Sequence, residues 1–137
     1  MKPLSNPIKE AERYLQNAKQ ILSEKAGKDG DIYEDPKYVK AAGNYAWNGV
    51  LLALDAVLNV KDNLKNGQRA DFQDYQTAIA KIDRKMPRTL LIAYDSLHKT
   101  LGYDGNPRYT IVQDSLKQAK EIISWAGQHY HPKKAAV

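Results

Sequence analysis

The 137-residue chain contains no cysteine, which removes three kinds of chemistry at once. Without a thiol it can form no disulfide, offer no thiolate nucleophile and hold no cysteine-ligated metal. The first residues, MKPLSNPIKEAER, turn polar and charged within nine positions and lack the apolar stretch of a secretory signal. We therefore expect a protein of the reducing cytoplasm.

Long hydrophobic runs are also missing. The most apolar segment, Ala46 to Val60, is shorter than the about 20 residues that cross a bilayer, and it contains Asn48 and Asp55. This segment predicts a core helix, and we expect no membrane contact. The length is that of one domain, so we expect a single helical domain over residues 1–137, with residues 128–137 as a mobile tail.

No long block carries charge of one sign. The net charge is +5, from 21 Lys and Arg against 16 Asp and Glu, and it is spread along the chain. Such a balance permits weak attraction to nucleic acid, but it serves solubility equally well. The charge alone therefore selects no partner.

Three Asn-Pro or Asp-Pro pairs predict helix starts. An Asn or Asp side chain accepts hydrogen bonds from the first free N–H groups of a helix, and proline at the first helical position loses no bond. The pairs begin at Asn6, Asp35 and Asn106.

Apolar residues recur at steps of three and four, the spacing of one helix face, in five segments. The segments cover about residues 7–27, 36–61, 71–86, 87–102 and 107–126. The polar stretch KDGDIYED reads as a loop, and Pro87 should break or kink the chain because it lacks an N–H. The sequence predicts an all-α, up-and-down bundle of about five helices.

The second helix carries two glycines, each costing up to about 1 kcal/mol in a helix interior relative to alanine. Small residues at steps of four and three form a stripe that would let a neighbouring backbone approach closely. We assign helix packing to this small-residue stripe, which consists of Ala42, Ala46, Gly49, Ala53 and Ala56. The same chemistry would serve a contact within the chain or between two subunits, and both readings stay open.

The segment KIDRKMPR holds the densest positive charge in the sequence. If the helix continues through Met86, its basic side chains share one face and could bind phosphates without sequence preference. These candidate nucleic-acid-binding residues are Lys81, Arg84, Lys85 and Arg88, which could be joined by Lys61, Lys65 and Arg69. A plain solvated face is the other reading.

Histidine offers little evidence of catalysis. His98 follows Asp95 by three residues, which could orient an imidazole, but Asp95 should turn outward. His129 and His131 are two residues apart and do not present ligands on one side of a helix, so we expect no metal. We expect Tyr14, Tyr75, Tyr94 and Tyr109 to pack in the core with their hydroxyls at the rim.

Two segments, IKEAERYLQNAKQIL and YVKAAGNYAWNGVLLALDAVL, resemble the first half of HEPN-type helical bundles. The whole chain resembles more closely a set of uncharacterised bacterial proteins of that architecture, known as a domain of unknown function. Active HEPN ribonucleases carry an arginine that is separated from a histidine by four to six residues, and no arginine stands at that spacing from any histidine of this chain. The resemblance implies a fold without those catalytic residues, and non-catalytic relatives act as interaction or nucleic-acid-binding modules, often as dimers.

We therefore predict a non-enzymatic interaction module that self-associates or binds a protein partner, without a cofactor. The alternative is an RNA- or polyanion-binding module that uses the four basic residues of KIDRKMPR. A third hypothesis is an enzyme centred on Asp95 and His98.

Overall fold

The computed structural model describes residues 6–58, 60, 64 and 68–132. Its first two long helices, α1 (Pro7–Glu24) and α2 (Pro36–Val57), begin as the sequence predicts. The Asn6 side chain accepts hydrogen bonds from the backbone N–H groups of Ile8 and Lys9, and Asp35 accepts one from Lys37. The predicted caps are confirmed for both helices. α2 is shorter than expected, since its C-cap is Leu58, and Lys61 lies outside the described residues.

The connection between α1 and α2 is a small β-hairpin, where the sequence predicted a loop. Strand β1 (Lys28–Asp29) pairs antiparallel with β2 (Ile32–Tyr33). Gly30, at the first central turn position, has a φ of +64°, whereas Asp31 is not in that region. This matches a type II′ turn, whose twist suits a hairpin.

A short helix and a long one follow α2. Helix α3 (Phe72–Ile82) starts with a capping box between Asp71 and Asp74. Helix α4 (Met86–Ala93) continues directly into a π-helical segment, η2 (Tyr94–Leu101). The expected continuation of the third helix through Met86 is wrong, because Asp83 is extended and ends α3. The break that proline was expected to cause does occur just before Pro87.

Helix α5 (Tyr109–His129) begins two residues later than Pro107 suggests. Asn106 accepts a hydrogen bond from the Arg108 N–H, ahead of the helix, and does not cap it. Residues 107–109 pair instead with the hairpin, through Tyr33 N–H to Pro107 O and Tyr109 N–H to Asp31 O. At its other end α5 reaches His129, two residues into the expected tail, and residues 133–137 lie outside the description.

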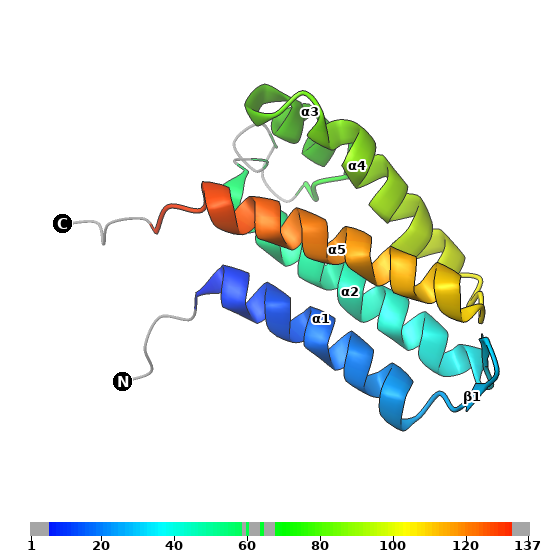
Figure 1. Cartoon of the computed structure of the whole chain (residues 1–137). Coiled ribbons are helices and arrows are strands. Elements are labelled where there is room, and N and C mark those ends of the chain that lie inside the picture. The colour runs from blue at the N-terminus through cyan, green and yellow to red at the C-terminus, as the bar shows by residue number, and fades with distance from the viewer. Residues whose placement is uncertain (1–5, 59, 61–63, 65–67, 133–137) are drawn as a thin grey trace.

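The helices form an all-α bundle in which successive long helices run in opposite directions (Figure 1). Helix α2 contacts α1, α5 and η2, so it is the central helix, as its apolar circumference predicts. Tyr75 on α3 donates a hydrogen bond to Asp55 on α2 at 2.7 Å. Burial, and then this bond, raises the pKa of the Tyr75 hydroxyl, which therefore stays protonated as a donor.

Within the part of the chain that is described, no helix is both long and apolar enough to span a membrane.

Candidate functional site

The small-residue stripe lies inside the chain. Ala42, Ala46 and Ala53 have no exposed surface, and Ala56 is half-buried. A Cβ built on Gly49 would lie 3.0 Å from the Ala11 carbonyl oxygen on α1. The stripe is thus occupied by this chain's own helices and is not free to contact a second subunit, which corrects that version of the interaction hypothesis.

The four basic residues do not share one helical face. Lys81 lies near the end of α3, Arg84 and Lys85 lie in the break, and Arg88 lies on α4. All four are exposed, as is Arg69, and none forms an ion pair with another described residue. Lys65, like Lys61, is outside the described residues. The corner between α3 and α4 therefore presents separate cations and not the continuous helical row that the sequence suggested.

The pair proposed for an enzyme is not formed. The Asp95 carboxylate meets Lys99 at 3.5 Å, and the His98 ring stacks on Tyr94 with centroids 5.1 Å apart. His129 instead bonds through Nδ1 to the Trp125 carbonyl at 2.9 Å. No group of three or more candidate metal ligands occurs among the described residues. This arrangement offers no catalytic centre around His98.

The outward side of α4 exposes two large apolar residues that the sequence interpretation did not single out. Leu91 is 45% exposed and Ile92 is 43% exposed. They lie between Arg88 on α4 and Asp95, the second residue of η2, at steps of three, one and three along the continuous helix. The four side chains therefore share one side of it, here called the α4 outer face. The sequence could have indicated this exposure, because Leu91 and Ile92 fall outside the helical row of apolar residues that contains the buried Leu90. Nearby Ile82, the last residue of α3, is also 46% exposed.

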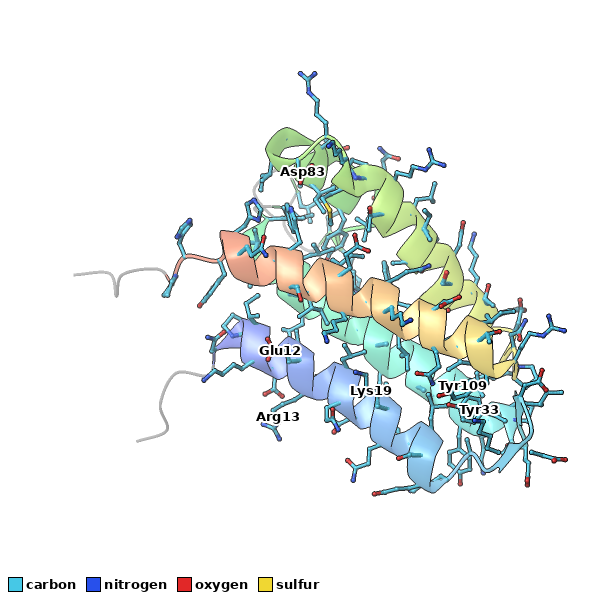
Figure 2. The ribbon with its side chains drawn as sticks, viewed as in Figure 1. Glu12, Arg13, Lys19, Tyr33, Asp83 and Tyr109 are labelled. Atoms are coloured by element: carbon cyan, nitrogen blue, oxygen red, sulfur yellow. The ribbon has the colours of Figure 1, made fainter. Side chains whose placement is uncertain are left out.

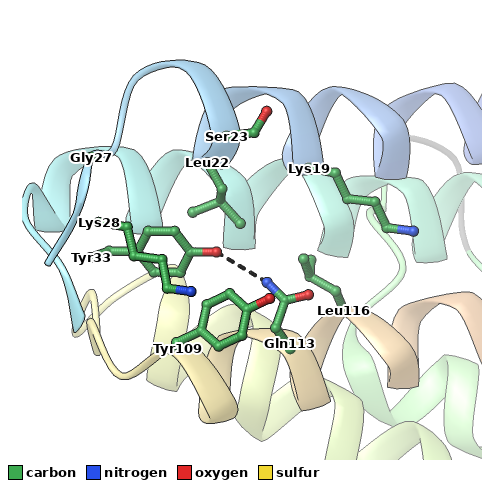
Figure 3. A pocket seen from close by; sticks show the side chains of 9 residues that line it. All are labelled: Lys19, Leu22, Ser23, Gly27, Lys28, Tyr33, Tyr109, Gln113 and Leu116. Carbon is green, nitrogen blue, oxygen red and sulfur yellow. Dashed lines mark hydrogen bonds between the residues drawn. The ribbon is translucent and has the colours of Figure 1, made fainter. Parts of the chain in front are cut away.

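A pocket of about 380 Å³ lies at the other end of the molecule, between α1, the hairpin and α5. Figure 2 shows Tyr33 and Tyr109 side by side there, far from Asp83 at the corner of α3 and α4. The residues that line it are Lys19, Leu22, Ser23, Gly27, Lys28, Tyr33, Tyr109, Gln113 and Leu116 (Figure 3). The sequence interpretation could not place Tyr33, because the hairpin that carries it was not predicted.

The charged side chains of this pocket are both cations, and its hydroxyl and amide side chains can donate hydrogen bonds. Gln113 Nε2 donates to the Tyr33 hydroxyl oxygen at 3.0 Å, and the Lys28 ammonium lies 3.8 Å from the centre of the Tyr109 ring. Burial is the main cause that raises the pKa of Tyr33, which keeps this hydroxyl neutral. The lining contains two lysines and no carboxylate.

Comparison with known families identifies the family of this chain. Residues 6–128 match the family described as Domain of unknown function (DUF5618). The chain belongs to this family. The match to DUF5618 confirms the expected resemblance to an uncharacterised family, and it covers both the pocket and the α4 outer face.

A solved structure supports the same assignment. The DUF5618 chain is 38% identical to a protein of unknown function from Dyadobacter fermentans, with a TM-score of 0.77. The alignment covers 89% of this chain and 93% of that protein. The comparison with curated proteins gives no match. The HEPN-like relationship remains a prediction.

Proposed function

We propose that this chain is a non-enzymatic interaction module of the cytoplasm that self-associates through the α4 outer face. The observation that carries the proposal is the exposure of Leu91 and Ile92 in the middle of a stripe with opposite charges at its ends. Exposed apolar side chains that adjoin on a helix gain free energy when a partner covers them.

Charge complementarity selects a second copy as the partner. In an antiparallel pair of α4 helices, a two-fold axis between Leu91 and Ile92 places these residues against their symmetry mates. The same register pairs Arg88 of each copy with Asp95 of the other, because both lie three and a half residues from the axis. Arg84 lies in the break before α4 and so does not extend this register, whereas Lys99 lies on η2, beyond Asp95.

Light scattering over a concentration series tests this proposal. The wild-type chain should approach twice its 15.5 kDa mass as concentration rises. Ile92→Glu should hold it at one chain, because the substitution buries two unpaired carboxylates in a symmetric contact. Ile32→Glu is the matched control, since Ile32 is 47% exposed but lies on the hairpin.

Two results would reject self-association through α4. One is a wild-type mass that stays at 15.5 kDa throughout the series. The other is an equal response of the Ile92 and Ile32 variants, which would place the contact elsewhere.

A second candidate function is RNA or polyanion binding at the α3–α4 corner. It is favoured by four exposed cations that form no ion pair with any residue the structure describes, namely Lys81, Arg84, Lys85 and Arg88. Binding of single-stranded RNA in a salt series tests it, because phosphate contacts release counterions and weaken as salt rises. Loss of binding in Arg84→Ala, but not in the distant Arg108→Ala, would support this function. Absence of binding at low salt would exclude it.

A further inference from the structure

The pocket between α1, the hairpin and α5 has the chemistry of a ligand site that is separate from the α4 outer face. We propose that it binds a small organic anion whose carboxylate or phosphate is attached to a planar, apolar body. Its volume, about 380 Å³, falls within the range of small-molecule sites. This inference does not rest on the proposed self-association.

The cation that would meet the anion is Lys28. Its ammonium lies over the Tyr109 ring at 3.8 Å and forms no ion pair with another described residue. A ring face attracts an ammonium more weakly than a carboxylate or phosphate does, so an incoming anion would gain a charge-assisted hydrogen bond. Lys19, at the other end of the pocket in Figure 3, adds positive charge without a neighbouring carboxylate in the lining.

The neutral donor is the Tyr33 hydroxyl. Its oxygen already accepts a hydrogen bond from Gln113, so its proton remains for a second acceptor. Burial raises the pKa of Tyr33 and keeps that proton in place. An anionic oxygen between Tyr33 and Lys28 would satisfy both groups.

The side chains that line the pocket favour a ligand with a planar, apolar body. The rings of Tyr33 and Tyr109 lie 5.8 Å apart at an angle of 44°, and Leu22 and Leu116 complete an aromatic and aliphatic surface. A flat hydrocarbon ring packs favourably on such walls, whereas inorganic phosphate uses only the polar groups.

The site is held in shape before a ligand arrives. Backbone hydrogen bonds of 2.8 and 2.7 Å join Tyr33 and Asp31 of the hairpin to Pro107 and Tyr109 at the start of α5. The two tyrosines are thereby fixed relative to each other by the main chain. Preorganisation lowers the entropic cost of binding, which favours a real site over an incidental hollow.

Calorimetric titration with phenyl phosphate, benzoate and phenol tests the proposal on the full chain. We expect both anions to bind and phenol, which lacks the charge, to bind much more weakly. Lys28→Met should weaken binding of the anions by about tenfold, the effect of losing one charge-assisted hydrogen bond. Tyr33→Phe, which keeps the ring, should weaken it by a smaller factor. The two anions together show whether the site prefers phosphate or carboxylate.

Lys37→Met is the matched control, because the Lys37 ammonium lies 4.8 Å from the centre of the Tyr38 ring but outside the pocket. It should leave the affinity unchanged, and circular dichroism should show that all variants are folded. Failure of both anions to bind at millimolar concentration would overturn the proposal. So would an equal loss in the Lys28 and Lys37 variants, or binding of phenol as tight as that of the anions. None of these results bears on the oligomeric state.

Discussion

Gly43 shows why a glycine is kept in the middle of a central helix. A Cβ at this position would lie 2.6 Å from Leu101 Cβ, 2.7 Å from the Gly102 nitrogen and 2.8 Å from the Leu97 oxygen. Two of these atoms belong to the backbone of the π-helical segment and its end, which cannot move aside as a flexible side chain can. The close approach of α2 and η2 therefore depends on the absence of a side chain.

Gly43→Ala should destabilise the protein by about 1–3 kcal/mol, the usual cost of overpacking. The control is Gly127→Ala in α5, where a Cβ would meet only Ile8 Cγ2, at 3.4 Å. That substitution should be neutral or stabilise by up to about 1 kcal/mol through helix propensity. Urea denaturation of both variants measures the difference. Equal effects of the two substitutions would contradict the close packing at Gly43.

At the scale of single residues, the sequence predicted the small-residue stripe but not the partner of each member. Gly49, in the stripe, meets α1, whereas Gly43, outside the stripe, meets η2, and helical spacing carries no information about which neighbour covers which face. Tyr33 could not be placed for a related reason. Its position depends on backbone pairing with residues 107–109, which are distant in the sequence.

Among the elements, the break between α3 and α4 depends on Asp83. Its carboxylate accepts hydrogen bonds from the Lys85 N–H at 2.9 Å and from Trp125 Nε1 at 3.1 Å. One side chain thus ends α3, supports the turn and ties that turn to α5. The sequence predicted a break at Pro87, but the anchor is a contact over more than 40 residues of sequence, which periodicity cannot detect.

Asp83→Ala should lower stability by about 1–3 kcal/mol, because the buried indole N–H of Trp125 is left without an acceptor. Trp125 fluorescence should report the change directly, alongside a denaturation curve. Asp104→Ala, in an exposed loop, should change stability by less than about 0.5 kcal/mol. If both alanine variants have the same stability, Asp83 does not anchor the turn.

The elements that the sequence missed share one property. The hairpin strands are two residues long, and η2 keeps its buried residues, Leu97 and Leu101, at ordinary helical spacing. Two-residue strands are too short to show a period, and the spacing in η2 predicts a helix but does not reveal its π-helical geometry. The long helices do, because each must bury a continuous apolar face, and their number and direction followed from that requirement.

For the molecule as a whole, the two candidate surfaces are built from different elements: the pocket lies between α1, the hairpin and α5, and the α4 outer face lies on α4 and the start of η2. The hairpin and α5 line the pocket without closing it, while α4 lies at an edge of the bundle (Figure 1). A dimer formed through α4 would leave the pocket open to solvent. The chain could therefore self-associate and bind a small anion at the same time.

The central claim is the antiparallel pairing of α4, and a charge-reversal cycle tests it most directly. Sedimentation equilibrium would compare the wild-type chain with Arg88→Asp, Asp95→Arg and the double variant. Each single reversal places like charges together twice in the symmetric dimer and should weaken it by about tenfold. The double variant should regain most of the wild-type affinity. The account would be contradicted if the double variant lost as much dimerisation free energy as the two single variants added together. A wild-type chain that never dimerises would contradict it as well.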